Sequence, residues 1–181
     1  MFDFTPAHNH LLVNHFPVEG SIFVLALLIY AMIRKHAELK RIALIGFVLL
    51  GVAAYVSDLT GGGASHEMKN VPGIQRALIE EHSNAADLAR FISYGVAAVA
   101  LVGLILAYRK PESVADSTDA TAYTRHHKEP NKWIVILCLI GGLLEVATFA
   151  KTAYQGGLIR HPEIQSSFPV PAAAVKDSTE D

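Results

Sequence analysis

Histidine is the residue type in this chain whose placement points most directly to chemistry. Nine histidines occur in 181 residues, and His8, His10 and His15 stand at or just before the start of a long apolar run. Imidazole nitrogens ligate haem iron, and they also bind copper, zinc and non-haem iron. Histidines at the mouth of an apolar helix therefore indicate a cofactor or metal site at the boundary between water and lipid.

Four apolar segments account for most of the remaining sequence. The chain is 51% hydrophobic with a mean hydropathy of +0.32, which is too apolar for an ordinary soluble domain. A helix that rises about 1.5 Å per residue needs about 20 residues to cross a hydrocarbon core of about 30 Å. Runs near this length lie at 16–33, 42–57, 85–108 and 133–154. They predict an all-α, antiparallel bundle of four transmembrane helices.

Basic residues at the ends of these segments predict the orientation, because Lys and Arg collect on the cytoplasmic side of a membrane. The connections after the first and third segments together carry nine of them, whereas the opposite side carries four. We therefore expect a multi-pass protein of the bacterial inner membrane, with both termini on the outer, periplasmic side. Membrane lipid is an expected partner, and nucleic acid is not.

The predicted organisation has four parts. Residues 1–110 hold the first three helices and an outer-side loop, and 111–130 form a mobile cytoplasmic linker of polar composition. Residues 131–160 are the fourth helix, and 161–181 are an outer-side tail. The single cysteine, Cys138, lies inside the fourth helix and cannot form an internal disulfide.

Local signals set the expected helix ends. Pro17 suits the first turn of the first helix, with Asn14 or His15 as its cap. Three successive glycines, residues 61–63, are expected to break the second helix, and Gly156 is a plausible end for the fourth.

Four sequence-distant histidines fall on the same side of this topology. His10 and His15 lie at the start of the first helix, His82 lies on the third, and His161 follows the fourth. Cofactor sites in helix bundles are built from facing helices. We predict these four residues as ligands of one or two b-type haems, or alternatively of copper, zinc or non-haem iron. Any haem would be non-covalent, because the chain contains no CxxCH motif.

His10 and His15 are five residues apart, which separates them by about 140° on a continuous helix. They would then not bind the same ion. Either His10 precedes the helix and bends back, or the two histidines serve different centres.

Ionisable residues at similar depth extend the predicted site. Arg90, Lys151 and Arg160 are candidate partners for haem propionates, and Glu19, Asp87 and Glu145 also lie within or near the apolar segments. Charged side chains inside a membrane are functional candidates by default. The alternative is that they pair with one another and only fix the packing of the helices.

Three motifs resemble, in order and spacing, a family of bacterial four-helix membrane proteins with a His-x-x-x-x-His-Phe-Pro start. The motifs are "HLLVNHFPVEG", "LTGGGASHEMKNVPGIQRALIEEHSNAA" and "GGLIRHPEI". The resemblance implies a four-helix fold and four positioned histidines, but no established activity. Where the family carries an acidic stretch this chain reads "GGGASH", so His66 stays outside the expected site. The positions carried over are His10, Asn14, His15, Phe16, Pro17, Pro72, Gly73, Glu81, His82, Gly156, Gly157, Arg160, His161 and Glu163.

Three functions agree with these observations. The first is a b-type cytochrome or redox-complex subunit, an electron-transfer protein more than a stand-alone enzyme, with other redox subunits, a c-type cytochrome or a quinone as partners. The second is a membrane protein that binds or handles a metal. The third is a structural subunit whose polar layer organises packing only.

Overall fold

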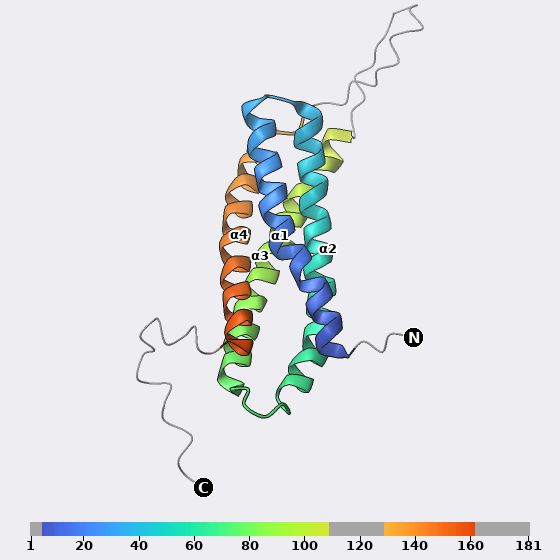
Figure 1. Ribbon diagram of the computed structural model, residues 1–181. Coiled ribbons are helices and arrows are strands. Elements are labelled where there is room, and N and C mark those ends of the chain that lie inside the picture. Colours follow the sequence, from blue (N-terminus) through green and yellow to red (C-terminus); the bar gives the residue numbers. More distant parts are fainter. Residues whose placement is uncertain (1–4, 109–128, 162–181) are drawn as a thin grey trace, which may run out of the picture.

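The computed structural model describes residues 5–108 and 129–161, which form four α-helices (Figure 1). Their bounds are α1 Pro6–Ile33, α2 Ala37–Met68, α3 Arg76–Tyr108 and α4 Lys132–Arg160. Each helix is long and apolar enough to cross a membrane, so the prediction of an all-α, multi-pass membrane protein is confirmed. The predicted linker and tail fall almost entirely outside the described residues.

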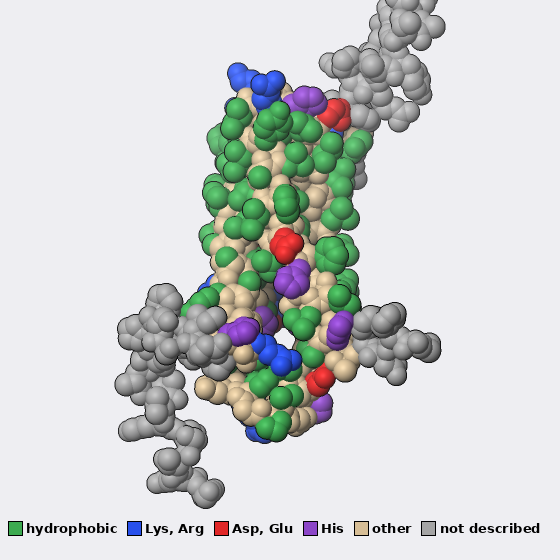
Figure 2. Space-filling view, viewed as in Figure 1, with side chains coloured by type: hydrophobic (Ala, Val, Ile, Leu, Met, Phe, Trp, Pro, Cys, Tyr) green, Lys and Arg blue, Asp and Glu red, His purple; other side chains and the backbone are tan. Residues whose placement is uncertain are grey.

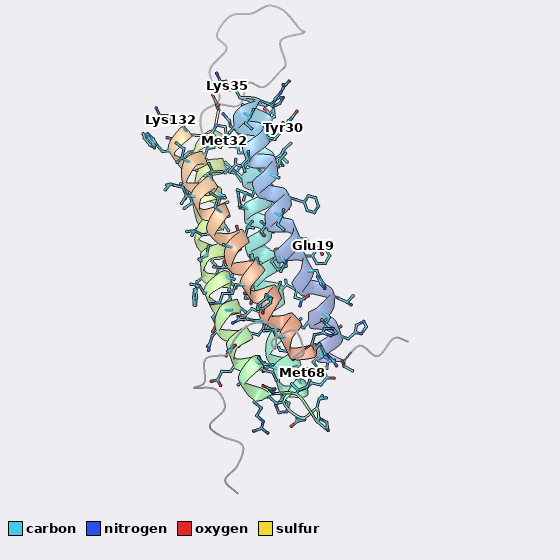
Figure 3. All side chains as sticks on the ribbon, turned by 60° about the vertical axis from the view of Figure 1, so that its left-hand side comes forward. Glu19, Tyr30, Met32, Lys35, Met68 and Lys132 are labelled. Carbon is cyan, nitrogen blue, oxygen red and sulfur yellow. The ribbon has the colours of Figure 1, made fainter. Side chains whose placement is uncertain are left out.

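The helices form a ring in which each contacts the next in sequence and α4 closes against α1. The most extensive contacts join α1 to α2 and α3 to α4, so the bundle consists of two paired hairpins. The turn of the first hairpin is tight. Lys35 takes a left-handed φ of 53°, and His36 caps α2 by accepting the Leu39 N–H. Figure 3 shows Lys35 and Lys132 at one end and Met68 at the other.

Large apolar side chains fill the centre of the bundle, among them Leu28, Leu44 and Phe47, which are fully buried. Small residues let neighbouring helices approach closely around them. A Cβ atom added at Gly51 would lie only 2.7 Å from the Cβ of Ala97 on α3. Lipid is as apolar as the core, so close van der Waals packing of this kind holds membrane helices together.

The first helix begins earlier than predicted. Thr5 is its cap, Pro6 occupies its first turn, and Pro17 lies inside it. The expectation of a start at Asn14 or His15 is therefore wrong. Thr followed by Pro is the stronger start, because the hydroxyl satisfies a free N–H and proline at the first position loses no hydrogen bond.

Neither glycine site ends its helix, which corrects two further expectations. α2 continues through residues 61–63 to Met68, and α4 continues through Gly156 to Arg160. Each glycine costs about 1 kcal/mol relative to alanine in a helix. Contacts with neighbouring helices offset that cost: at Gly63, an added Cβ would lie 3.1 Å from Pro6 on α1.

Candidate functional site

Two of the predicted ligands, His10 and His82, lie close together at one end of the bundle, with their rings in an edge-on arrangement. Their ring centroids are 6.5 Å apart and their planes are inclined at 77°. Both side chains are half-buried. His10 comes from the second turn of α1 and His82 from the second turn of α3, so each hairpin supplies one imidazole. We call the end of the bundle around this pair the histidine end.

The ring of His10 is fixed by α2. Its Nδ1 lies 3.1 Å from the backbone oxygen of Ser57 and 3.1 Å from the hydroxyl oxygen of Thr60. That hydroxyl donates to the same Ser57 oxygen at 2.9 Å. Because a carbonyl oxygen only accepts, the hydrogen-bond network assigns the proton of His10 to Nδ1. Its Nε2 then keeps a lone pair.

The ring of His82 is fixed in the same manner by α4. Its Nδ1 lies 3.0 Å from the backbone oxygen of Thr152, which again assigns the proton to Nδ1. A neutral imidazole that donates from Nδ1 to a backbone carbonyl is the arrangement in which Nε2 binds a metal. The two histidines thus share one tautomer suited to ligation.

Glycines give both histidines access to these carbonyls. Ser57 is followed four residues later by Gly61, and Thr152 by Gly156. An added Cβ would lie 3.4 Å from Cε1 of His10 at Gly61 and 3.1 Å from Cε1 of His82 at Gly156. In a helix, the side chain at i+4 stands beside the carbonyl at i. The absence of a side chain there lets each ring reach the oxygen, and the same device recurs in both hairpins.

Two buried polar atoms on α1, which carries His10, and on α4, which contacts His82, have no hydrogen-bond partner among the described residues: Oδ1 of Asn14 and Oε1 of Gln155. Asn14 lies one turn beyond His10, and Gln155 lies between the two α4 residues that contact His82. A buried polar atom without a partner in a native fold requires an explanation, such as a bound group or water. Figure 2 shows an opening in the side-chain surface at this end, where most of the visible histidines gather.

His15 and His161 do not join this pair. The side chain of His15 is 67% exposed, and its Nδ1 lies 3.7 Å from Oε1 of Glu19, which is also exposed. Figure 3 shows Glu19 directed away from the bundle. Because α1 is continuous, the five-residue spacing turns His15 away from the face that carries His10. His161 is the exposed cap at the end of α4.

The predicted propionate partners also lie in different surroundings. Arg90 is bound by two carboxylates, with nitrogens 2.5 Å from Oδ2 of Asp58 and 2.8 Å from Oδ1 of Asp87. Lys151 is exposed, and the exposed Arg160 lies 3.9 Å from the sulfur of Met68. The charge of Arg90 is therefore already balanced within the protein.

The alternative of a metal held by protein ligands alone needs a third or fourth donor. Within residues 5–108 and 129–161, no three His, Cys, Asp or Glu side chains gather into a group that could hold a metal ion. Two imidazoles suit a ring-shaped ligand such as haem, which supplies four donors of its own. The donor set around His10 and His82 thus fits haem better than a bare ion.

Sequence reasoning missed the residues that orient the histidines: Ser57, Thr60 and Thr152. A backbone carbonyl leaves no mark on residue type, so two of these contacts had no direct signal. The recurrence of a small hydroxyl residue followed four positions later by glycine, once on each of two helices, is the pattern that could have found them.

Comparisons with protein-family models, with curated proteins and with solved structures return no match for this chain. The likeness to the His-Phe-Pro family therefore rests on the three motifs alone, and the argument for function rests on the geometry of His10 and His82.

Proposed function

We propose that this protein is a b-type cytochrome of the bacterial inner membrane, which carries electrons through one haem bound between His10 and His82. The observation that carries the proposal is the close pair of imidazoles from α1 and α3, each donating from Nδ1 to a backbone carbonyl. Haem supplies reversible one-electron chemistry at its iron. His10 and His82 would hold the iron through their Nε2 atoms.

The spacing of the rings supports this assignment. If the Nε2 atoms of both residues held one iron at about 2.0 Å, with about 1.1 Å from each nitrogen to its ring centre, the two ring centres would lie about 6.2 Å apart. The centroids of His10 and His82 are 6.5 Å apart. Axial imidazoles can be rotated about their shared axis, so an interplanar angle of 77° is compatible with the pair.

Orientation of the rings is the contribution of α2 and α4. The carbonyls of Ser57 and Thr152 hold the Nδ1 protons, which fixes each Nε2 as the ligating atom and raises its basicity. Since the two ligands come from different hairpins, a haem bound by both would join the hairpins. Its removal should therefore loosen the histidine end more than the opposite end.

Orientation in the membrane follows from the distribution of Lys and Arg. We propose an antiparallel bundle with both termini and the histidine end on the outer side, because basic residues concentrate at the 34–41 turn and around Lys132. A haem at the outer boundary can exchange electrons with a c-type cytochrome or another redox subunit outside, and with a quinone in the lipid.

The test is an alanine series in protein purified with haem or reconstituted with it. Replacing His10 or His82 should abolish the six-coordinate, low-spin spectrum, because each change removes one axial nitrogen. His15→Ala and His161→Ala are matched controls and should retain it. Low-spin haem in both His10→Ala and His82→Ala would refute the assignment. A colourless protein with bound copper, zinc or iron would instead favour the metal-binding alternative.

A further inference from the structure

Glu145 lies on α4 in the interior of the bundle, away from the histidine end. Its side chain is fully buried, at 0% relative exposure. Oε1 accepts a hydrogen bond of 2.7 Å from the hydroxyl of Ser93 on α3. Oε2 is also buried and has no hydrogen-bond partner in the described part of the chain. One half of this carboxyl group is thus free to carry a proton.

No positive charge balances Glu145 within the described residues. Arg90 lies one turn from Ser93 on α3, but its guanidinium binds Asp58 and Asp87. An ionised carboxylate in an apolar interior is strongly disfavoured unless it is paired.

Two further buried polar side chains of the bundle, Cys138 and Ser21, are neutral. Cys138, about two turns away on the same helix, is a buried thiol. Ser21, the buried polar side chain of α1, donates to the Val18 carbonyl. From α2 the contact is apolar, through the ring of Phe47 against α4. Without a positive charge nearby, such as that of ferric haem, these surroundings therefore favour the neutral, protonated form of Glu145.

A stripe of polar side chains connects Glu145 to the histidine end along one face of α4. Thr148, Thr152 and Gln155 follow it at spacings of three, seven and ten residues, which places all four within about 80° on a helix. Thr148 donates to the carbonyls of residues 144 and 145, and Thr152 donates to that of Thr148. The stripe passes Thr152, whose carbonyl lies 3.0 Å from Nδ1 of His82, and ends one turn later at Gln155.

We propose that Glu145 is a proton-binding site linked to the redox state of the haem, an inference that rests on the function proposed above. A haem held there would supply the one-electron chemistry, its iron going from ferric to ferrous with an electron from a quinol or a reduced cytochrome. One proton from the aqueous phase at the histidine end then binds the Glu145 carboxylate. On oxidation the electron leaves to an acceptor and the proton returns to water, so charge and mass balance in both directions.

Glu145 lies close enough to the histidine end for the linkage between its protonation and the redox state of the haem to be measured. Thr152, whose carbonyl contacts the axial ligand His82, follows Glu145 by seven residues, or about 10.5 Å along the helix. Reduction of a haem held by His82 would remove one positive charge near that end of the helix, and the low-dielectric interior between His82 and Glu145 screens charges poorly. Removal of that charge favours the protonated carboxyl.

The experiment is a redox titration of the haem in purified full-length protein over a range of pH. In the wild type the midpoint potential should fall as pH rises, because ionised Glu145 stabilises ferric iron. Glu145→Gln, which mimics the protonated carboxyl, should lose this dependence and stay at the low-pH potential of the wild type. Cys138→Ala, a buried change on the same helix, should keep the wild-type dependence.

A second variant keeps the proposal testable if Glu145→Gln fails to fold. Ser93→Ala removes the hydroxyl that donates to the carboxylate, which disfavours ionisation and should move the pH-dependent range to higher pH. Wild-type profiles in both variants, with haem bound normally, would overturn the role of Glu145 and leave the cytochrome proposal intact. Failure of the wild type to bind haem would refute both.

Discussion

Replacing Gly156 with alanine should weaken haem binding through a contact with a single ring. The added Cβ would lie 3.1 Å from Cε1 and 3.3 Å from Nδ1 of His82. Ordinary carbon–carbon contacts begin near 3.5 Å, so the ring must move by about 0.4 Å. Movement away from α4 lengthens the bond from Nδ1 to the Thr152 oxygen from 3.0 Å toward about 3.4 Å.

The expected magnitude follows from that hydrogen bond. A bond of this kind contributes about 1 kcal/mol, and its loss corresponds to about a fivefold weaker affinity for haem. Alanine also favours the helix by about 0.5 to 1 kcal/mol relative to glycine, whatever its surroundings. The global stability of the variant should therefore not fall, although its affinity for haem does.

Gly157→Ala is the matched control. A Cβ at Gly157 meets no atom within 4 Å, yet the residue is adjacent in sequence and lies in the same helix. Titration of both apoproteins with haem, followed by absorbance in detergent or nanodiscs, isolates the contact with His82. Equal affinities for Gly156→Ala and Gly157→Ala would refute the claim that Gly156 positions this ring.

Two further pairs of glycines give matched tests. Gly61→Ala places a Cβ at 3.4 Å from Cε1 of His10, which is an ordinary contact, so its loss of haem affinity should be smaller than that of Gly156→Ala. Gly62→Ala, whose Cβ meets no atom within 4 Å, should show no loss. Haem titration checks this order, and a larger loss for Gly62→Ala would contradict it. Gly51→Ala would bring its Cβ to 2.7 Å from that of Ala97, and overpacking of this kind costs about 1 to 3 kcal/mol. Gly95→Ala meets no atom within 4 Å and should not destabilise the protein, which thermal unfolding in detergent can measure; equal melting temperatures would argue against close packing at Gly51.

The four helices could be predicted from sequence because membrane thickness imposes a length on each apolar run. Their ends could not. The run at 42–57 gave no indication that α2 continues through three glycines to Met68. Glycine is a poor helix former by its own propensity, but close contact with α1 decides the outcome here, and such contacts are visible only in three dimensions.

The candidate site could be predicted in part. His10 and His82 belong to the four histidines expected at one end of the chain's topology, and they lie together. His15 lies about 7.5 Å further along α1 than His10 and faces outward, because the unpredicted start of α1 at Pro6 makes the helix continuous past it. Depth along a helix can be read from sequence, whereas the direction of a side chain depends on where the helix begins.

The charged residues show the same limit. Arg90 was expected to serve a cofactor, but its nitrogens bind Asp58 on α2 and Asp87 on its own helix. Asp87 could be paired with Arg90 from their three-residue spacing. The contact with Asp58 could not be predicted, because it depends on the register between α2 and α3.

The most direct test of the central claim is one optical spectrum of the purified wild-type protein, oxidised and then reduced, with haem added if little co-purifies. A haem held between His10 and His82 predicts a strong Soret band and, on reduction, the sharp α band of a six-coordinate low-spin b-type cytochrome. A folded protein that stays colourless and takes up no added haem would contradict the account.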